Sequence, residues 1–97
     1  MKSTGISEVK DINSTRARDA LQNEPGTYIM CSKTHCSRCR HAMGPYESLA
    51  DSGATCYKVD EKKDRCGLFN ALGFDMYPMI IKSEGGGRYT AVTSRFI

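Results

Sequence analysis

The chain has 97 residues, of which 39% are hydrophobic and 26% are charged. This length suits one compact domain, residues 1–97, and leaves no room for a second. The 14 Lys and Arg residues exceed the 11 Asp and Glu residues by only three, and they form no continuous run. Composition therefore argues against a nucleic-acid-binding protein, which favours a concentrated basic stripe.

The first half of the chain alternates between strand-like and helix-like patterns. The elements expected here are a short strand at residues 6–10, a helix at 16–23, a strand at 27–31 and a helix at 36–51. Asn13 or Ser14 is expected to cap the first helix, which Pro25–Gly26 ends. The β-prone run Thr27–Cys31 is typical of a strand buried on both faces. Pro45 predicts a kink in the second helix because it cannot donate a backbone hydrogen bond.

The second half continues the alternation and ends in a hairpin. The elements expected here are a strand at residues 55–59, a helix capped by Asp60 and running through Leu72, a strand at 79–82, a glycine turn at 85–87 and a strand at 88–92. The order is β-α-β-α-β-α-β-β. Strands separated by helices favour parallel pairing, and the hairpin adds an antiparallel edge. We therefore expect an α/β fold, a mixed sheet with helices on both faces.

The five cysteines and the first residues of the chain suggest the cellular compartment in which the protein works. Residues 1–20 never hold more than two apolar residues together, so we expect no secretory signal. No segment approaches the apolar length that spans a bilayer, so we expect no membrane contact. Cysteines in such a chain are expected in the reducing cytoplasm, where a permanent disulfide framework is disfavoured. Catalysis, metal binding or burial then has to explain them.

The motif Cys36-Ser37-Arg38-Cys39 lies where an apolar strand is expected to give way to a helix. A thiolate at a helix N-terminus is stabilised by unpaired N–H groups and by the helix dipole, so its pKa falls. Arg38, within the motif, adds positive charge that acts in the same direction. We expect Cys36 to be the exposed nucleophile and Cys39, one turn further, to be the resolving thiol. This spacing brings the two sulfurs within bonding distance.

Two metal sites compete with this interpretation. His35 and His41 flank the pair Cys36–Cys39 and complete a zinc ligand set, although structural zinc sites favour two separated ligand pairs. The spacing Cys-x4-Cys-x2-Cys that begins at Cys31 matches plant-type iron–sulfur proteins, with Cys66 as a fourth ligand. Against this, Cys31 ends an expected buried strand. Both alternatives stay open at this point.

From about Ile6 to Val92 the chain resembles the thioredoxin family. Tyr28–Cys31 stands where that family has its central strand, and Cys36–Cys39 falls on its redox motif. His35 stands where thioredoxins usually carry Trp. The resemblance implies a thioredoxin-like fold and a redox-active disulfide without a cofactor. Arg38 and His35, which depart from the family pattern, are the residues expected to tune the pKa of Cys36.

The resemblance extends to the stretch Leu72–Met79, which is similar to the segment that leads to the family's cis-proline. It implies that Pro78 is cis and packs against the disulfide. Met76, Tyr77 and Pro78 would then bind substrate, with the Met76 backbone free to pair with an extended segment. Tyr77 is expected either to cover the disulfide or to be an exposed aromatic residue.

Several positions depart from the family pattern. The buried acid that assists the second cysteine in thioredoxins falls here on Met30, so Lys58 is expected to lack a partner, and proton transfer at Cys39 has to use water, His41 or another group. The family's last helix is shortened or missing, which predicts a bare apolar sheet face and a homodimer or partner docked on it. The glycines at 85–87 lie within the hairpin turn, which argues against a glutaredoxin.

The sequence predicts an enzyme that reduces or exchanges disulfides in protein substrates. A reductase or a small thiol would supply the electrons. Cys31, Cys56 and Cys66 are expected to be buried core thiols, with a role for Cys31 in exchange as an alternative. An alternative for the whole chain is a redox-inactive thioredoxin-like module that mediates assembly.

Overall fold

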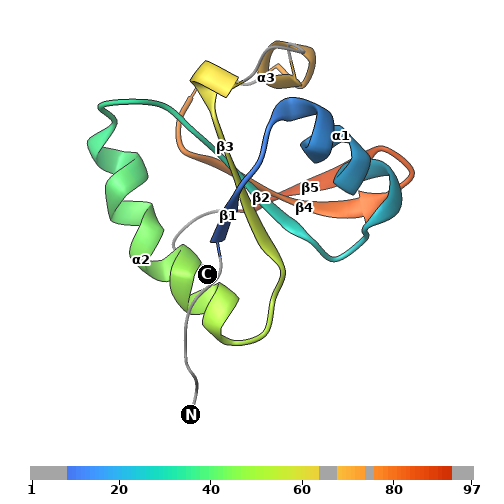
Figure 1. The fold of residues 1–97 in the computed structure, drawn as a ribbon, viewed down its shortest axis with the longest axis horizontal. Helices are drawn as coiled ribbons and strands as arrows, with labels where there is room; N and C mark the ends of the chain where they lie inside the picture. The colour runs from blue at the N-terminus through green and yellow to red at the C-terminus, as the bar shows by residue number, and fades with distance from the viewer. Residues whose placement is uncertain (1–8, 64–67, 74–75, 93–97) are drawn as a thin grey trace.

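A computed structural model of the protein describes residues 9–63, 68–73 and 76–92 (Figure 1). Its elements follow the predicted alternation, ending in two consecutive strands. They are β1 (Val9–Asp11), α1 (Ser14–Asn23), β2 (Tyr28–Ser32), α2 (Ser37–Asp51), β3 (Cys56–Asp60), the 3-10 turn η1 (Glu61–Lys63), α3 (Leu68–Ala71), β4 (Met79–Gly85) and β5 (Arg88–Val92). The first strand was predicted at residues 6–10; its residues 6–8 lie outside the described part of the chain.

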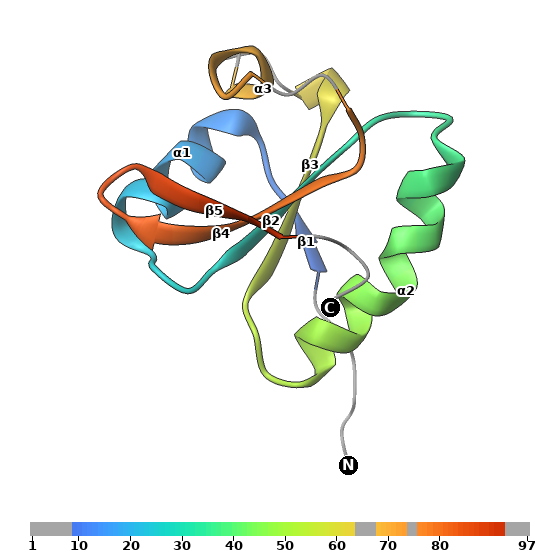
Figure 2. The ribbon, with the colours of Figure 1, turned by 180° about the vertical axis from the view of Figure 1, so that it is seen from behind.

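The five strands form one mixed sheet in the order β1-β3-β2-β4-β5. β1 and β2 both pair with β3 in parallel, and β4 pairs with β2 in antiparallel orientation. β5 returns antiparallel to β4 at the edge, as the sequence predicts. Because β2 is the central strand, the loop at its C-terminal end begins in the middle of the sheet (Figures 1 and 2).

The two faces of the sheet carry separate cores. Ile29 and Cys31 of β2 face α1 and α3, where they pack in one cluster with Leu21 and Phe69. Met30, which alternates with them, faces α2 and packs in a second cluster. Strand periodicity explains this division, because successive side chains point to opposite faces. Helices on both faces of the sheet are therefore confirmed.

Helix ends follow local capping rules. Asn13 caps α1 as predicted, since its side-chain oxygen accepts the backbone N–H of Arg16 at 2.8 Å. Asp60 accepts the backbone N–H of Lys62 at 3.0 Å. α2 continues through Pro45, which lies inside the helix. None of the helices in the described part of the chain is long and apolar enough to cross a membrane.

The predicted third helix is where the structure departs most from the sequence analysis. Its start adopts the 3-10 turn η1, and its end is the four-residue helix α3. Leu68 and Phe69 of α3 are buried in the core cluster that also contains Val59 of β3. Packing of these two side chains determines the position of α3, whereas the helical pattern over residues 60–72 indicated only which side chains are apolar.

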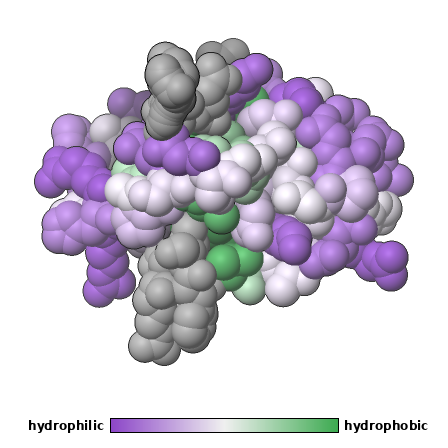
Figure 3. All heavy atoms as spheres, turned by 90° about the horizontal axis from the view of Figure 1, so that it is seen from below, coloured by the Kyte–Doolittle hydropathy of each residue, from purple (hydrophilic) through white to green (hydrophobic). Residues whose placement is uncertain are grey.

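The sheet face beyond α2 carries more polar side chains than expected. Lys82 of β4 and its partner Thr90 of β5 lie on this face, and the Thr90 hydroxyl donates to Glu84 at 2.8 Å. Met76 is the exposed large hydrophobic residue of the described part. Figure 3 shows mainly hydrophilic surface on one side of the molecule, with a small hydrophobic area. Residues 93–97, where the family's last helix would begin, lie outside the described ranges, and the homodimer stays a prediction.

Candidate functional site

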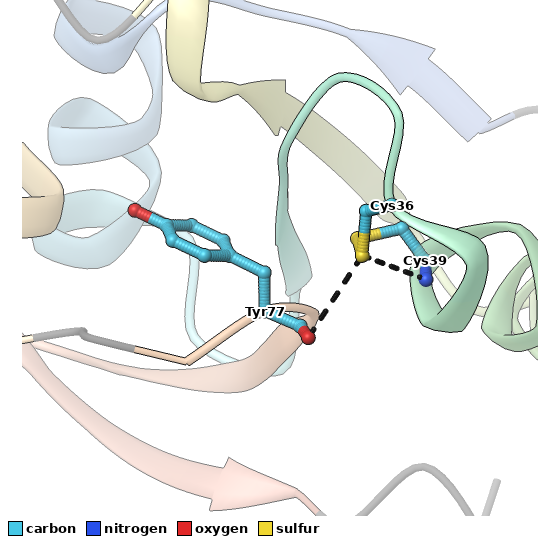
Figure 4. Close-up of a disulfide and its surroundings, with 3 residues drawn as sticks. All are labelled: Cys36, Cys39 and Tyr77. Carbon is cyan, nitrogen blue, oxygen red and sulfur yellow. Dashed lines mark hydrogen bonds between the residues drawn. A yellow bond between two sulfur atoms is a disulfide. The ribbon is translucent and has the colours of Figure 1, made fainter.

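Cys36 and Cys39 form a disulfide at the N-terminal end of α2 (Figure 4). Their Cα atoms are 5.2 Å apart, as expected for residues separated by one helical turn. Cys36 lies at the end of the loop that follows the central strand β2, and Cys39 lies in the first turn of α2. The pair that the sequence singled out is therefore joined covalently in the structure.

Cys36 is the N-cap of α2 and occupies the position at which a helix offers unpaired N–H groups. Its extended backbone has φ −108°, and its Sγ accepts the backbone N–H of Cys39 at 3.1 Å. When the disulfide is reduced, that N–H and the positive end of the helix dipole face the same sulfur. Both favour the thiolate of Cys36 over its thiol.

Exposure distinguishes the two sulfurs. The Cys36 residue is half-buried, whereas Cys39 is only 6% exposed. Arg38, which lies between the two cysteines in the sequence, has an exposed side chain. A substrate disulfide can therefore approach Cys36 from solvent, while Cys39 is shielded and can be reached mainly through Cys36. This difference agrees with the predicted roles of nucleophile and resolving thiol.

The peptide bond between Tyr77 and Pro78 is cis, as the family resemblance implied. The Tyr77 carbonyl oxygen points toward the disulfide and lies 3.9 Å from the Cys36 Sγ (Figure 4). The Tyr77 ring points away from the disulfide and packs on Phe69, with ring centroids 5.5 Å apart. Neither alternative expected for Tyr77 is found: its ring does not cover the disulfide (Figure 4), and the residue is half-buried. The backbone of Tyr77 is what faces the sulfur.

A groove of about 400 Å³ separates the start of α2 from the segment that precedes β4. Arg38 and His41 line it on the helix side, and Met76 and Pro78 line it on the other side. Met76 is 65% exposed. The three residues predicted to bind substrate, Met76, Tyr77 and Pro78, therefore all lie along one groove next to the redox pair.

A smaller cavity of about 170 Å³ lies on the sheet side of Cys39. Ser32, Lys58 and Asp60 line it, because they project toward α2 from the ends of β2 and β3. Met30, on which the family resemblance places a buried acid, is fully buried in the apolar cluster under α2. Polar side chains near Cys39 therefore come from the ends of the strands.

Asp60 is a candidate functional residue that the sequence analysis treated only as a helix cap. It is the carboxylate among the described residues that line the cavity shared with Cys39. Its strand position, two residues after Lys58, was a usable signal, since alternate residues share a face. Lys58 itself was expected to lack a partner, and this is wrong: its Nζ lies 3.5 Å from the Asp11 carboxylate, directly across the β1–β3 pair.

The remaining described thiols are core residues. Cys31 is fully buried in the cluster beneath α1, and Cys56 is 1% exposed beneath α2. Burial raises the pKa of the Cys56 thiol to about 11. Cys66 lies outside the described residues. Within the described ranges, no group of three or more His, Cys, Asp or Glu side chains is arranged to hold a metal ion.

Among the comparisons with known proteins, only the comparison of structures finds similar proteins. No protein-family model matches the chain, and no curated protein sequence is similar to it. Among solved structures, thioredoxin from Trypanosoma brucei brucei superimposes with a TM-score of 0.76 at 17% identity, over 91% of this chain and 80% of that one. The J-Trx1 fragment of ERdj5 gives 0.75 at 16% identity, over 88% of this chain and 43% of the fragment.

A third similar structure is the complex of ferredoxin:thioredoxin reductase with thioredoxin f2, with a TM-score of 0.68 at 15% identity, over 92% of this chain and 82% of that one. The chain spans less than half of the ERdj5 fragment but most of the length of the trypanosome thioredoxin. At these identities the similarity establishes the fold. The predicted thioredoxin-like fold is confirmed.

Proposed function

We propose that this chain of thioredoxin fold is a thiol–disulfide oxidoreductase that reduces or exchanges disulfides in protein substrates. One observation carries the proposal: the Cys36–Cys39 disulfide caps α2 and lies beside the carbonyl of the cis Tyr77–Pro78 bond. A half-buried first cysteine, a shielded second cysteine and an adjoining groove are the parts that disulfide exchange requires.

The reaction proceeds by two thiolate attacks. The Cys36 thiolate attacks one sulfur of the substrate disulfide, forming a mixed disulfide and releasing the other substrate sulfur as a thiolate, which takes a proton from water. The Cys39 thiolate then attacks the Sγ of Cys36, forming the Cys36–Cys39 disulfide and releasing the second substrate thiolate. Two electrons pass from the protein to the substrate, and the reverse sequence oxidises a dithiol.

The second attack requires Cys39 to lose its proton although it is shielded. Asp60 is the group we assign as acceptor, directly or through one water in the cavity that it lines with Cys39. A carboxylate in this position takes the place of the buried acid that is absent at Met30. Lys58, on the same wall, adds a positive charge that favours the thiolate.

Regeneration of the dithiol requires an electron donor, which we assign to a reductase or a small thiol. The structural similarity to thioredoxin f2, which forms a complex with ferredoxin:thioredoxin reductase, supports a reductase as donor. Arg38 and the start of α2 stabilise the Cys36 thiolate and hence the reduced state, which makes the disulfide form a better oxidant. We place this activity in cell redox homeostasis and electron transport in the cytoplasm, where the core thiols stay reduced.

Turnover of a disulfide-bonded model protein tests the proposal, with dithiothreitol as electron donor and the uncatalysed rate subtracted. The wild-type protein is expected to accelerate reduction, and Cys36→Ser to abolish the acceleration. Ser37→Ala is the matched control, since Ser37 is the next residue after Cys36 and its side chain is exposed. Failure of the wild-type protein to accelerate reduction contradicts the proposal and favours a redox-inactive assembly module.

A further inference from the structure

Five basic side chains surround the disulfide within a stretch of nine residues. They belong to the loop after β2 and to the first turns of α2, and all five are exposed: Lys33, His35, Arg38, Arg40 and His41. We call this set the basic rim. Its members line every cavity that we describe around the disulfide. Asp60 is the single acidic residue among the described residues that line these cavities.

Among the described residues, the two arginines of the rim lack the acidic partners that Arg16 and Lys58 have elsewhere in the molecule. Arg16 pairs with Asp19 at 2.9 Å and with Glu24 at 2.7 Å, and Lys58 pairs with Asp11. For Arg38 and Arg40 no acidic partner is found within the described part of the chain. Lys33 lies over the Tyr77 ring, with its Nζ 5.6 Å from the centroid. The positive charge is thus concentrated where substrate has to approach.

The groove beside the rim suits an extended peptide. It holds about 400 Å³, with Arg38 and His41 on one wall and the exposed Met76 on the other. A segment lying there places one flank of its disulfide against basic side chains and an apolar residue against Met76. A second cavity, of about 330 Å³, is lined by Cys36 itself together with Lys33, His35 and Arg38. A substrate that enters either cavity therefore meets the positive charge of Arg38.

We propose that the preferred substrates are protein disulfides flanked by Asp or Glu residues in an extended segment. This inference rests on the proposed function and adds a substrate class to it. Opposite charges across an interface increase the rate of encounter and disfavour wrongly charged partners. Arg38 contributes most, since it lines both the groove and the cavity that contains Cys36.

Single-turnover reduction of three peptides by the pre-reduced protein tests this inference. The peptides have equal length and the same internal disulfide, flanked by Glu, by Ser or by Lys. The ratio of their second-order rate constants is informative because the reactivity of the Cys36 thiolate is common to all three and cancels. At low salt the Glu peptide is expected to react about three- to tenfold faster than the Ser peptide, and the Lys peptide more slowly. The ratio is expected to approach one in about 0.5 M salt.

Two variants locate the effect. Arg38→Gln is expected to reduce the Glu-to-Ser ratio about two- to threefold, because one charge next to the disulfide is lost. Arg88→Gln removes the same charge from the start of β5, at the hairpin end of the sheet, and is expected to keep the wild-type ratio. Equal rates for the three peptides, or an unchanged ratio in Arg38→Gln, overturn the inference.

The outcomes separate the two proposals. Reduction of the Ser peptide at the rate of the Glu peptide overturns the acidic preference and leaves the oxidoreductase proposal standing. If none of the peptides is reduced, the oxidoreductase proposal fails and the substrate class fails with it.

Discussion

The carbonyl oxygen of Tyr77 lies 3.9 Å from the Sγ of Cys36, although the two residues are 41 positions apart in the chain. The same sulfur accepts the backbone N–H of Cys39 at 3.1 Å. In the reduced protein the sulfur therefore has a donor on one side, which favours its thiolate, and an acceptor on the other, to which its thiol can donate. The segment of Met76 to Pro78 thus borders the reacting atom, and a substrate strand along it lies within reach of Cys36.

Replacing Cys39 with Ser is expected to stop the reaction at the mixed disulfide. Cys36 can still attack the substrate, but the second sulfur that releases the product is missing. Intact-mass analysis of Cys39→Ser after incubation with a disulfide substrate is expected to show one covalent adduct that dithiothreitol removes. Cys36→Ser serves as the control and is expected to form no such adduct; an equal adduct yield in the two variants contradicts the assigned roles.

The thiols of the reduced protein are expected to react with iodoacetamide in the order of their exposure and ionisation. Cys36 is half-buried at a helix N-terminus and reacts first, near neutral pH. Cys31 and Cys56 have exposed fractions of 0% and 1% and are expected to react only after unfolding. Peptide mapping after short pulses gives the order, and labelling of Cys31 before Cys36 is inconsistent with the assignment of the nucleophile.

Replacing Asp60 with Asn is expected to prolong the mixed disulfide about tenfold or more, since the proton acceptor for Cys39 is lost. Quenched-flow mass spectrometry measures the lifetime of the adduct. Loss of a negative charge by itself lowers the pKa of a nearby thiol and accelerates the attack. A longer lifetime of the mixed disulfide therefore indicates that Asp60 accepts the proton, whereas a shorter lifetime indicates that it acts only as a neighbouring charge.

Glu61→Gln is the matched control for Asp60, because it makes the same charge change at the next residue, whose side chain is exposed. It is expected to leave the lifetime of the mixed disulfide at the wild-type value. An adduct that decays equally fast in Asp60→Asn and Glu61→Gln rules out the role of Asp60.

Stability is expected to fall at alkaline pH because of Cys56. Burial raises its pKa from 9.0 to about 11, so the folded state holds its proton more tightly than the unfolded state. The contribution to the free energy of unfolding is fully present below pH 9 and is lost as the pH rises toward 11, by about 1–3 kcal/mol. Urea unfolding between pH 8.5 and 10.5 measures this loss.

Cys56→Ala isolates that contribution from the other groups that titrate in the same range. Both proteins are compared on a Cys36→Ser, Cys39→Ser background, so that no disulfide exchanges at alkaline pH. Removing the Cys56 thiol is expected to lower stability at all pH values and to make the alkaline decline shallower. Parallel pH profiles for the two proteins argue against a raised pKa at Cys56.

The sequence alone predicted those structural features that depend on residues close together in the chain. The Asn13 cap, the start of α2 at Cys36 and the final hairpin all depend on residues close together in the chain, and they are confirmed. The cis bond before Pro78 followed from resemblance and is also confirmed. The helix predicted over residues 60–72 was wrong at its start, where η1 forms, because an apolar pattern carries no information on how the side chains pack.

Only the tertiary structure decided which distant residues meet at the redox pair. The pairing of Lys58 with Asp11 depends on the register between β1 and β3, and the place of Asp60 near Cys39 depends on the crossing of α2 over the ends of β2 and β3. The approach of the Tyr77 carbonyl to Cys36 likewise requires the antiparallel pairing of β2 with β4. Sequence spacing predicts neighbours along one element, whereas contacts between elements follow from strand register and from the packing of buried side chains.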